Sequence, residues 1–147
     1  PTVAAAPAPP PMASRGELIL LVEDENGVRR FAKRALEHHG FQVIDAATPE
    51  DALAMAAAAD PRPTLLLTDV VMPRLSGPEL AVRLTAMLPG LIVLYMSGYP
   101  KSLVLRDGLL DPSMRLLPKP FTTAALVAYV QEALDAPEGR RAGSEAP

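Results

Sequence analysis

Short apolar runs alternate along this chain with segments of helical periodicity. The runs are LILLV at residues 18–22, FQVID at 41–45, TLLLTD at 64–69, LIVLYMS at 91–97 and MRLLPK at 114–119. Three of the five read as buried strands, because continuous apolar runs are typical of parallel strands that are covered on both faces. The alternation predicts an α/β fold, in which helices cover a parallel sheet.

Helical signals fill the intervals between the runs. The first apolar stripe has helical spacing and consists of Val28, Phe31, Ala32, Ala35 and Leu36. Thr48 and Ser76 each stand as N-cap residues before a proline and early carboxylates. The remaining helices are expected between Pro100 and Gly108 and after Thr122. The pattern therefore predicts five strands and five helices.

The two ends of the chain differ in composition from the segment between them. Residues 1–16 are rich in Pro and Ala and are expected to form a linker, because such sequences favour extended conformations and bury no core. Residues 17–135 are expected to fold as one domain, and residues 136–147 to form a disordered tail. Because the first residue is Pro rather than Met, we expect the chain to be a piece of a longer polypeptide.

Composition and charge narrow the function classes. The formal net charge is −3 and the pI is near 5.4, which argues against direct contact of this segment with nucleic acid or an anionic membrane. No apolar stretch approaches the roughly 18 residues that a membrane-spanning helix needs. The chain has no Cys, which fits a reducing compartment. We therefore expect a cytoplasmic location.

Polar and charged residues end or directly follow four of the apolar runs. They are Glu23, Asp24, Asp69, Ser97 and Lys119. Right-handed crossovers gather the strand ends at one edge of a doubly wound sheet, where such sheets bind ligands. Neighbouring carboxylates stay ionised together only beside a cation, and hard oxygen ligands suit Mg²⁺. The sequence therefore predicts a metal and phosphoryl site, in which Asp69 is the best-placed nucleophile.

The stretches around these residues resemble those of response-regulator receiver domains. The matching motifs are LLVEDE, LLLTDVVMPRLSGPEL, VLYMSGY and LPKPF, in that order, and the similarity covers essentially all of residues 17–135. The resemblance implies a flavodoxin-like, doubly wound sheet of five parallel strands in the order 2-1-3-4-5, flanked by five helices. It also implies Mg²⁺ as the cofactor, for which Mn²⁺ can substitute.

The resemblance assigns a role to each motif residue. Asp69 is expected to be the phosphoacceptor, and Ser97 and Lys119 are expected to contact phosphoryl oxygens as catalytic residues. The implied metal ligands are Glu23, Asp24, Asp69 and the backbone carbonyl of Val71. The side chains of Val71 and Tyr99 lie beside the expected path of an attacking water, so they should tune the lifetime of the phosphate.

Three further expectations concern positions near these motifs. Leu116 stands three residues before Lys119, where many receivers carry a Tyr or Phe that turns inward on phosphorylation. The usual hydroxyl-to-aromatic switch is therefore not expected in its ordinary form. Glu23 stands where Asp is more common, and its longer side chain is expected to change the metal geometry. The Lys119–Pro120 peptide bond is expected to be cis, an isomer that proline makes accessible.

The function implied by the resemblance is that of a phosphorelay module. The domain should take a phosphoryl group from a phosphohistidine on a histidine kinase or a histidine phosphotransfer protein. It would catalyse only its own phosphorylation and dephosphorylation, so its classification as an enzyme stays open. The residues of MSGY, LPKPF and GELILLVEDE most resemble receivers of hybrid sensor histidine kinases. The chain is therefore expected to be the C-terminal part of such a kinase, a parent chain that can be membrane-bound. A stand-alone response regulator is the alternative.

Three other functions use similar elements. A haloacid-dehalogenase-like phosphatase needs a second Asp two residues after its nucleophile, where this chain has Val71. A flavodoxin-like cofactor carrier would rest its phosphate on the loop EDEN, whose adjacent carboxylates repel it. A pseudo-receiver would lack part of the phosphoacceptor set, whereas this chain carries Asp69, Asp24, Ser97 and Lys119.

Overall fold

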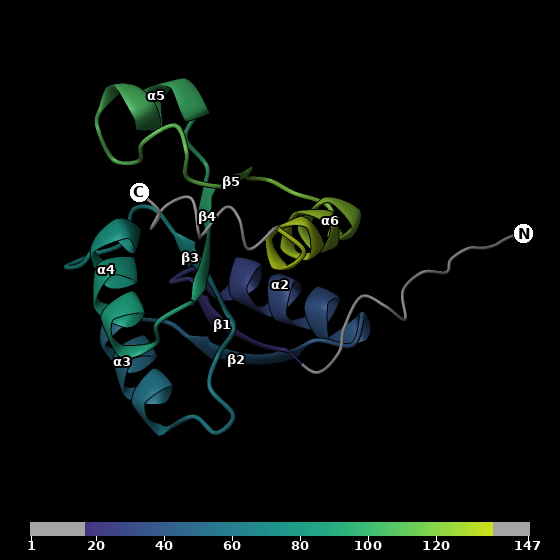
Figure 1. Ribbon diagram of the computed structural model, residues 1–147. Helices are drawn as coiled ribbons and strands as arrows, with labels where there is room; N and C mark the ends of the chain where they lie inside the picture. The colour runs from purple at the N-terminus through teal and green to yellow at the C-terminus, as the bar shows by residue number, and fades with distance from the viewer. Residues whose placement is uncertain (1–16, 137–147) are drawn as a thin grey trace, which may run out of the picture.

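The computed structural model of this protein describes residues 17–136, which form a parallel sheet between two layers of helices (Figure 1). The expected linker at residues 1–16, and the expected tail from residue 137 on, lie outside the described residues.

The strands follow the apolar runs closely. They are β1 (Leu18–Val22), β2 (Gln42–Ala46), β3 (Leu65–Asp69), β4 (Ile92–Ser97) and β5 (Leu116–Pro118). All pairings are parallel, and the strand order is β2-β1-β3-β4-β5. The predicted doubly wound sheet and its order are confirmed.

The described residues also contain the five expected helices. They are α2 (Asn26–His38), α3 (Pro49–Ala58), α4 (Gly77–Met87), α5 (Lys101–Arg106) and α6 (Thr123–Leu134). Figure 1 shows α2 and α6 on one face of the sheet, and α3 and α4 on the other. None of these helices is long and apolar enough to cross a membrane.

Two apolar cores fill the space between the sheet and its helices. Along β1, Ile19 and Leu21 pack toward α2 and α6, whereas Leu20 and Val22 pack toward α3 and α4. Every residue of β1 and β3 is buried. Because burial of a Leu or Val side chain contributes about 1.5–3 kcal/mol, the two central strands are the most firmly held part of the sheet.

Side-chain caps begin three of the helices, two of them at the N-cap residues that the sequence predicts. Thr48 Oγ1 accepts a hydrogen bond from the Asp51 N–H at 3.1 Å, and Thr122 Oγ1 accepts one from the Ala125 N–H at 3.0 Å. Ser76 and Glu79 form a reciprocal capping box. Each cap satisfies a donor that the first helical turn leaves unpaired.

One residue of the first apolar stripe differs from its helical neighbours. Phe31 is 42% exposed, whereas Ala32 and Ala35 are buried. It lies at the margin of the stripe, where its ring centroid is 6.0 Å from that of Phe121. This aromatic pair stands beside the carboxyl ends of the strands, next to the site described below.

Candidate functional site

Three carboxylates meet at the carboxyl edge of the sheet. One oxygen each of Glu23, Asp24 and Asp69 lies within 4.8 Å of the others. Glu23 and Asp24 follow β1 directly, and Asp69 ends β3, the neighbouring strand. Glu23 is fully buried and Asp69 is 8% exposed, whereas Asp24 is open to solvent. The predicted juxtaposition of these side chains is therefore present in the fold.

Lys119 supplies positive charge to the two buried carboxylates. Its Nζ lies 2.7 Å from Glu23 Oε1 and 3.0 Å from Asp69 Oδ1, and it donates a hydrogen bond to Asp69 Oδ2 at 3.1 Å. These contacts raise the pKa of Lys119 against the lowering effect of its burial. One ammonium group thus bridges the ends of β1 and β3.

The backbone on either side of Lys119 fixes its direction. Pro118 lies opposite Ser97 in the register of β4 and β5, and the Lys119 N–H donates to the Ser97 carbonyl at 2.8 Å. The peptide bond between Lys119 and Pro120 is cis. As the edge strand, β5 tolerates Pro118, which has no N–H to donate.

Glu23 is held through both its backbone and its side chain. Its N–H donates to the Ala46 carbonyl at 3.1 Å, which continues the pairing of β1 with β2. Its Oε2 accepts a hydrogen bond from the Glu25 N–H at 3.0 Å. The buried carboxylate is therefore oriented before any ligand arrives, which lowers the cost of binding one.

Asp69 has an unusual ionisation equilibrium for an aspartate. Burial, and then the charge of Glu23, raise its pKa to about 7, while Lys119 acts in the opposite direction. At neutral pH a bound cation would compete with the proton for this carboxylate. Carboxyl groups with a pKa raised by burial and by a neighbouring charge often occur at functional sites.

The loop that follows Asp69 folds back tightly on β3. The Gly77 N–H donates to the Val70 carbonyl at 2.8 Å, and a Cβ on Gly77 would overlap the backbone carbonyl of Asp69. Only glycine permits this approach without displacing the loop. Val71, in the same loop, is 47% exposed.

Ser97 ends β4 at the same edge and is 2% exposed. Its Oγ accepts a hydrogen bond from the Tyr99 N–H at 2.9 Å. Tyr99, in the loop after Ser97, is 56% exposed and lines with Val71 and Leu103 a hollow of about 330 Å³. The two predicted tuning residues therefore share one surface beside the site.

Leu116 lies away from the carboxylates, on the face of the sheet that α3 and α4 cover. It stands opposite Tyr95 in the register of β4 and β5, and Tyr95 is buried in the same core. An aromatic side chain thus lies beside the position where many receivers carry one, but it comes from the neighbouring strand.

The donor set fits a small hard cation such as Mg²⁺. Three carboxylates offer oxygen ligands close together, and hard oxygens are the ligands that Mg²⁺ prefers. The buried Oε1 of Glu23 lies 2.7 Å from Lys119 Nζ, and a carboxylate oxygen can accept more than one partner. That oxygen retains capacity for a further positive partner.

Two residues that support the site were missed by the sequence reasoning. Gly77 has no reactive side chain, and its role depends on how closely the loop approaches the backbone of Asp69. Arg29, in α2, donates from NH1 to the Glu23 carbonyl at 2.9 Å. A signal for Arg29 was present, because a cation in the first turn of a helix is disfavoured by the helix dipole and needs partners.

The sequence of this chain is similar to those of known proteins. Residues 19–131 match the response regulator receiver domain family. The chain is 35% identical over 117 residues to sensor kinase CckA of Brucella abortus (strain 2308). It is 36% identical over 116 residues to the response regulator receiver protein CpdR of the same strain.

The matches cover different shares of these proteins. The alignment with CckA spans 80% of this chain but 12% of the kinase, whereas that with CpdR spans 79% of this chain and 95% of CpdR. A crystal structure of the receiver domain from hybrid histidine kinase CckA superimposes with a TM-score of 0.66 at 34% identity. That superposition covers 80% of this chain and 99% of the CckA domain.

Proposed function

This chain belongs to the response regulator receiver domain family. We propose that its Asp69 accepts a phosphoryl group from a phosphohistidine in an Mg²⁺-dependent reaction. The observation that carries the proposal is the position of Asp69 at the end of the central strand β3, within 3.1 Å of Lys119 and beside two further carboxylates. These are the parts that phosphoryl transfer requires, namely a nucleophile, a cation and oxygen ligands for a metal.

The residues act on charge and position. An oxygen of Asp69 forms a bond to phosphorus as the bond from phosphorus to the histidine nitrogen breaks, and the imidazole leaves. Lys119 offsets negative charge on the phosphoryl oxygens, and Ser97 donates a hydrogen bond to one of them. Glu23, Asp24, Asp69 and the Val71 carbonyl would hold Mg²⁺, which would supply further positive charge at these oxygens.

Val71 favours this function over that of a phosphatase. A haloacid-dehalogenase-like enzyme would use an acidic residue at this position to protonate the leaving group. The side chain here is apolar, so it offers no proton. The acyl phosphate formed on Asp69 is then a signalling state, whose hydrolysis rate we expect to depend on Val71 and Tyr99.

Intact-mass spectrometry with acetyl phosphate tests the proposed reaction. The protein should gain the mass of one phosphoryl group in the presence of Mg²⁺ and none when the metal is removed with EDTA, because without the cation the phosphate is repelled by the carboxylates. Mn²⁺ should restore the adduct. An adduct that forms equally well in EDTA would contradict the metal-dependent site.

A groove beside the site supports docking of a protein donor. It has a volume of about 480 Å³ and runs from the start of α2 to Lys119. Phe31, Phe121 and Pro120 line it together with Val28. An apolar groove next to Lys119 would let apolar side chains of a donor protein pack beside the reacting atoms. We therefore propose that this groove binds a histidine kinase or a histidine phosphotransfer protein.

Replacing Phe31 by alanine should affect transfer from a protein donor but not transfer from acetyl phosphate. Transfer from a phosphohistidine protein should slow about tenfold, because loss of an exposed aromatic anchor at an interface costs about 1–2 kcal/mol. Transfer from acetyl phosphate, which needs no docking, should stay within twofold. Both rates are measured by following the phosphorylated protein over time.

Val82→Ala is the matched control for this change. Val82 is an exposed apolar residue of α4, on the opposite face of the sheet, so its loss should leave both rates unchanged. If Phe31→Ala transferred from the protein donor as fast as the wild type did, the assignment of the groove would be wrong.

The parent protein is proposed separately. The similarity to CckA, together with the MSGY and LPKPF motifs, supports a receiver domain from the C-terminal part of a hybrid sensor histidine kinase. The match to CpdR at nearly the same identity supports a stand-alone regulator. The coding sequence that adjoins this segment decides between them, since a hybrid parent requires a kinase domain there. A cytoplasmic location remains a prediction.

A further inference from the structure

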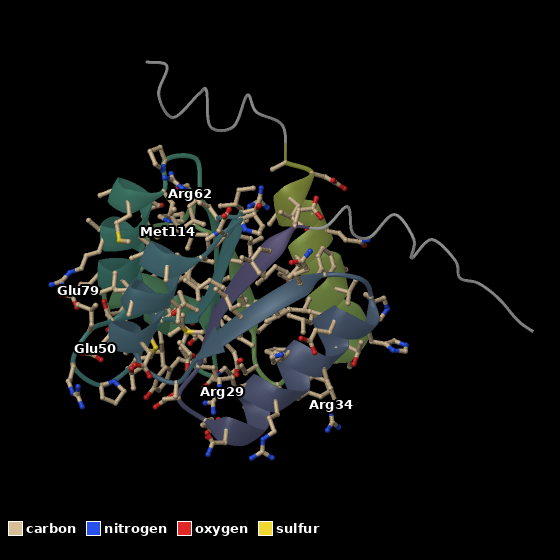
Figure 2. All side chains as sticks on the ribbon, turned by 90° about the horizontal axis from the view of Figure 1, so that it is seen from below. Arg29, Arg34, Glu50, Arg62, Glu79 and Met114 are labelled. Atoms are coloured by element: carbon tan, nitrogen blue, oxygen red, sulfur yellow. The ribbon has the colours of Figure 1, made fainter. Side chains whose placement is uncertain are left out.

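Arg29 ties three segments of the chain together behind the carboxylates. Its Nε donates to Asp45 Oδ2 at 3.2 Å, on β2, and its NH2 donates to Asn26 Oδ1 at 2.6 Å, at the start of α2. Its NH1 donates to the Glu23 carbonyl at 2.9 Å. Figure 2 shows Arg29 near the start of α2, with Arg34 further along the same helix.

The guanidinium group is well enclosed for a surface helix. Its side chain is 15% exposed, and the side chain of Asp45 is 29% exposed. α2 has neither an acidic residue in its first turn nor a side-chain cap. A cation at this end of a helix is unfavourable by itself, so the contact with Asp45 offsets the cost of placing Arg29 there.

The carbonyl that Arg29 contacts belongs to the peptide that joins Glu23 to Asp24. The Glu23 N–H, which belongs to the preceding peptide, donates a hydrogen bond to the Ala46 carbonyl of β2. Because the peptide group is planar, holding this carbonyl restricts the directions in which both carboxylate side chains leave the backbone. The side chain of Asp24 is exposed.

We infer that Arg29 is a positioning residue for the metal site, which orients the Glu23–Asp24 peptide so that the two carboxylates converge with Asp69. This inference rests on the proposed function, in which these carboxylates hold Mg²⁺. Lysine cannot replace arginine here, because a single ammonium group cannot reproduce the planar fork that reaches Asp45, the Glu23 carbonyl and Asn26 together.

A positioning role of Arg29 and a purely electrostatic role predict opposite changes in metal affinity when Arg29 is replaced. Loss of a positive charge near an acidic site should tighten cation binding. Loss of orientation should weaken it, and residues that orient metal ligands typically change metal affinity by about 10–100-fold. Arg29→Gln should therefore bind Mg²⁺ about tenfold more weakly than the wild type, and Arg29→Lys should show nearly the same loss.

Arg30→Gln is the matched control. Arg30 is the next residue of α2, is exposed and loses the same charge on substitution. Mg²⁺ affinity of all four proteins is measured by titration calorimetry, and with Mn²⁺ by electron paramagnetic resonance, neither of which depends on phosphorylation. The amide NMR spectrum in the absence of metal checks folding, and Arg29→Lys carries the test if Arg29→Gln is unfolded.

A kinetic readout separates positioning from general damage. The Mg²⁺ concentration for half-maximal phosphorylation by acetyl phosphate should rise about tenfold in Arg29→Lys, while the rate at saturating Mg²⁺ stays within twofold. Affinity within twofold of the wild type in Arg29→Lys would overturn the inference. Failure of wild-type protein to accept phosphate would instead overturn the proposed function, because the calorimetric comparison would still stand.

Discussion

Replacing Lys119 by methionine is expected to slow phosphoryl transfer to Asp69 strongly while leaving Mg²⁺ binding intact or tighter. Lys119 Nζ is the cation nearest to Asp69, at 3.0 Å from Oδ1. Removal of one such group from the transition state typically costs about 10²–10³-fold in rate. The same removal leaves the carboxylates of Glu23 and Asp69 without a cation, so their attraction for Mg²⁺ increases once both are ionised.

The metal-free form of this variant should also lose stability. Breaking a buried ion pair by deleting one partner costs about 3–5 kcal/mol unless the remaining charge is neutralised. Here Asp69 can take up a proton or Mg²⁺ can bind, so addition of Mg²⁺ should raise the thermal midpoint of Lys119→Met more than that of the wild type.

Lys101→Met provides the control for this prediction. Lys101 is an exposed residue at the start of α5, and its replacement should change neither transfer nor Mg²⁺ binding. Acetyl phosphate labelling and calorimetry are run on the same samples at saturating Mg²⁺. If Lys119→Met accepted phosphate at the wild-type rate, Lys119 would have no role in the reaction.

Apparent Mg²⁺ affinity should fall about tenfold for each pH unit below about 7, because Asp69, whose pKa is raised to about 7, must release a proton before it can bind the metal. An ordinary aspartate, with a pKa near 3.8, would give no such dependence in this range. Affinity between about pH 5 and pH 7 should therefore change by about fiftyfold.

The stability of the metal-free protein should change in the corresponding direction. Between about pH 4 and pH 7 the folded chain holds a proton on Asp69 that the unfolded chain releases, so the free energy of unfolding falls as the pH rises, by roughly 1 kcal/mol per pH unit. Asp69→Asn should remove this slope. If calorimetric titrations gave the same Mg²⁺ affinity between about pH 5 and pH 7, Asp69 would be ionised in the folded state and the prediction would be wrong.

The fold and the main site were predictable because both depend on local patterns. An apolar run that ends in a charged residue defines a strand and its ligand edge at once. In a parallel sheet all such ends lie together, so Asp69 and Lys119, fifty positions apart in the sequence, could be placed at one site without knowledge of any contact. The capping residues Thr48 and Ser76 fixed the helix starts for the same local reason.

The supporting contacts could not be predicted because they depend on tertiary packing. The close approach of Gly77 to the Asp69 carbonyl is set by the path of the loop, and the contact of Arg29 with Asp45 joins α2 to β2 across the end of β1. The exposure of Phe31 is likewise a property of the surface that α2 and the loop after β5 form together. Helical periodicity alone places Phe31 in the apolar stripe of α2 and does not show how exposed it is.

The central claim is that Asp69 carries the phosphoryl group, and the most direct measurement locates it. After reaction with acetyl phosphate and Mg²⁺, borohydride reduces an aspartyl phosphate to homoserine, which tandem mass spectrometry assigns to one position. We predict homoserine at position 69 and none in Asp69→Asn treated in the same way. Homoserine at Asp24 or another position, or a phosphoryl adduct of undiminished yield in Asp69→Asn, would contradict the account.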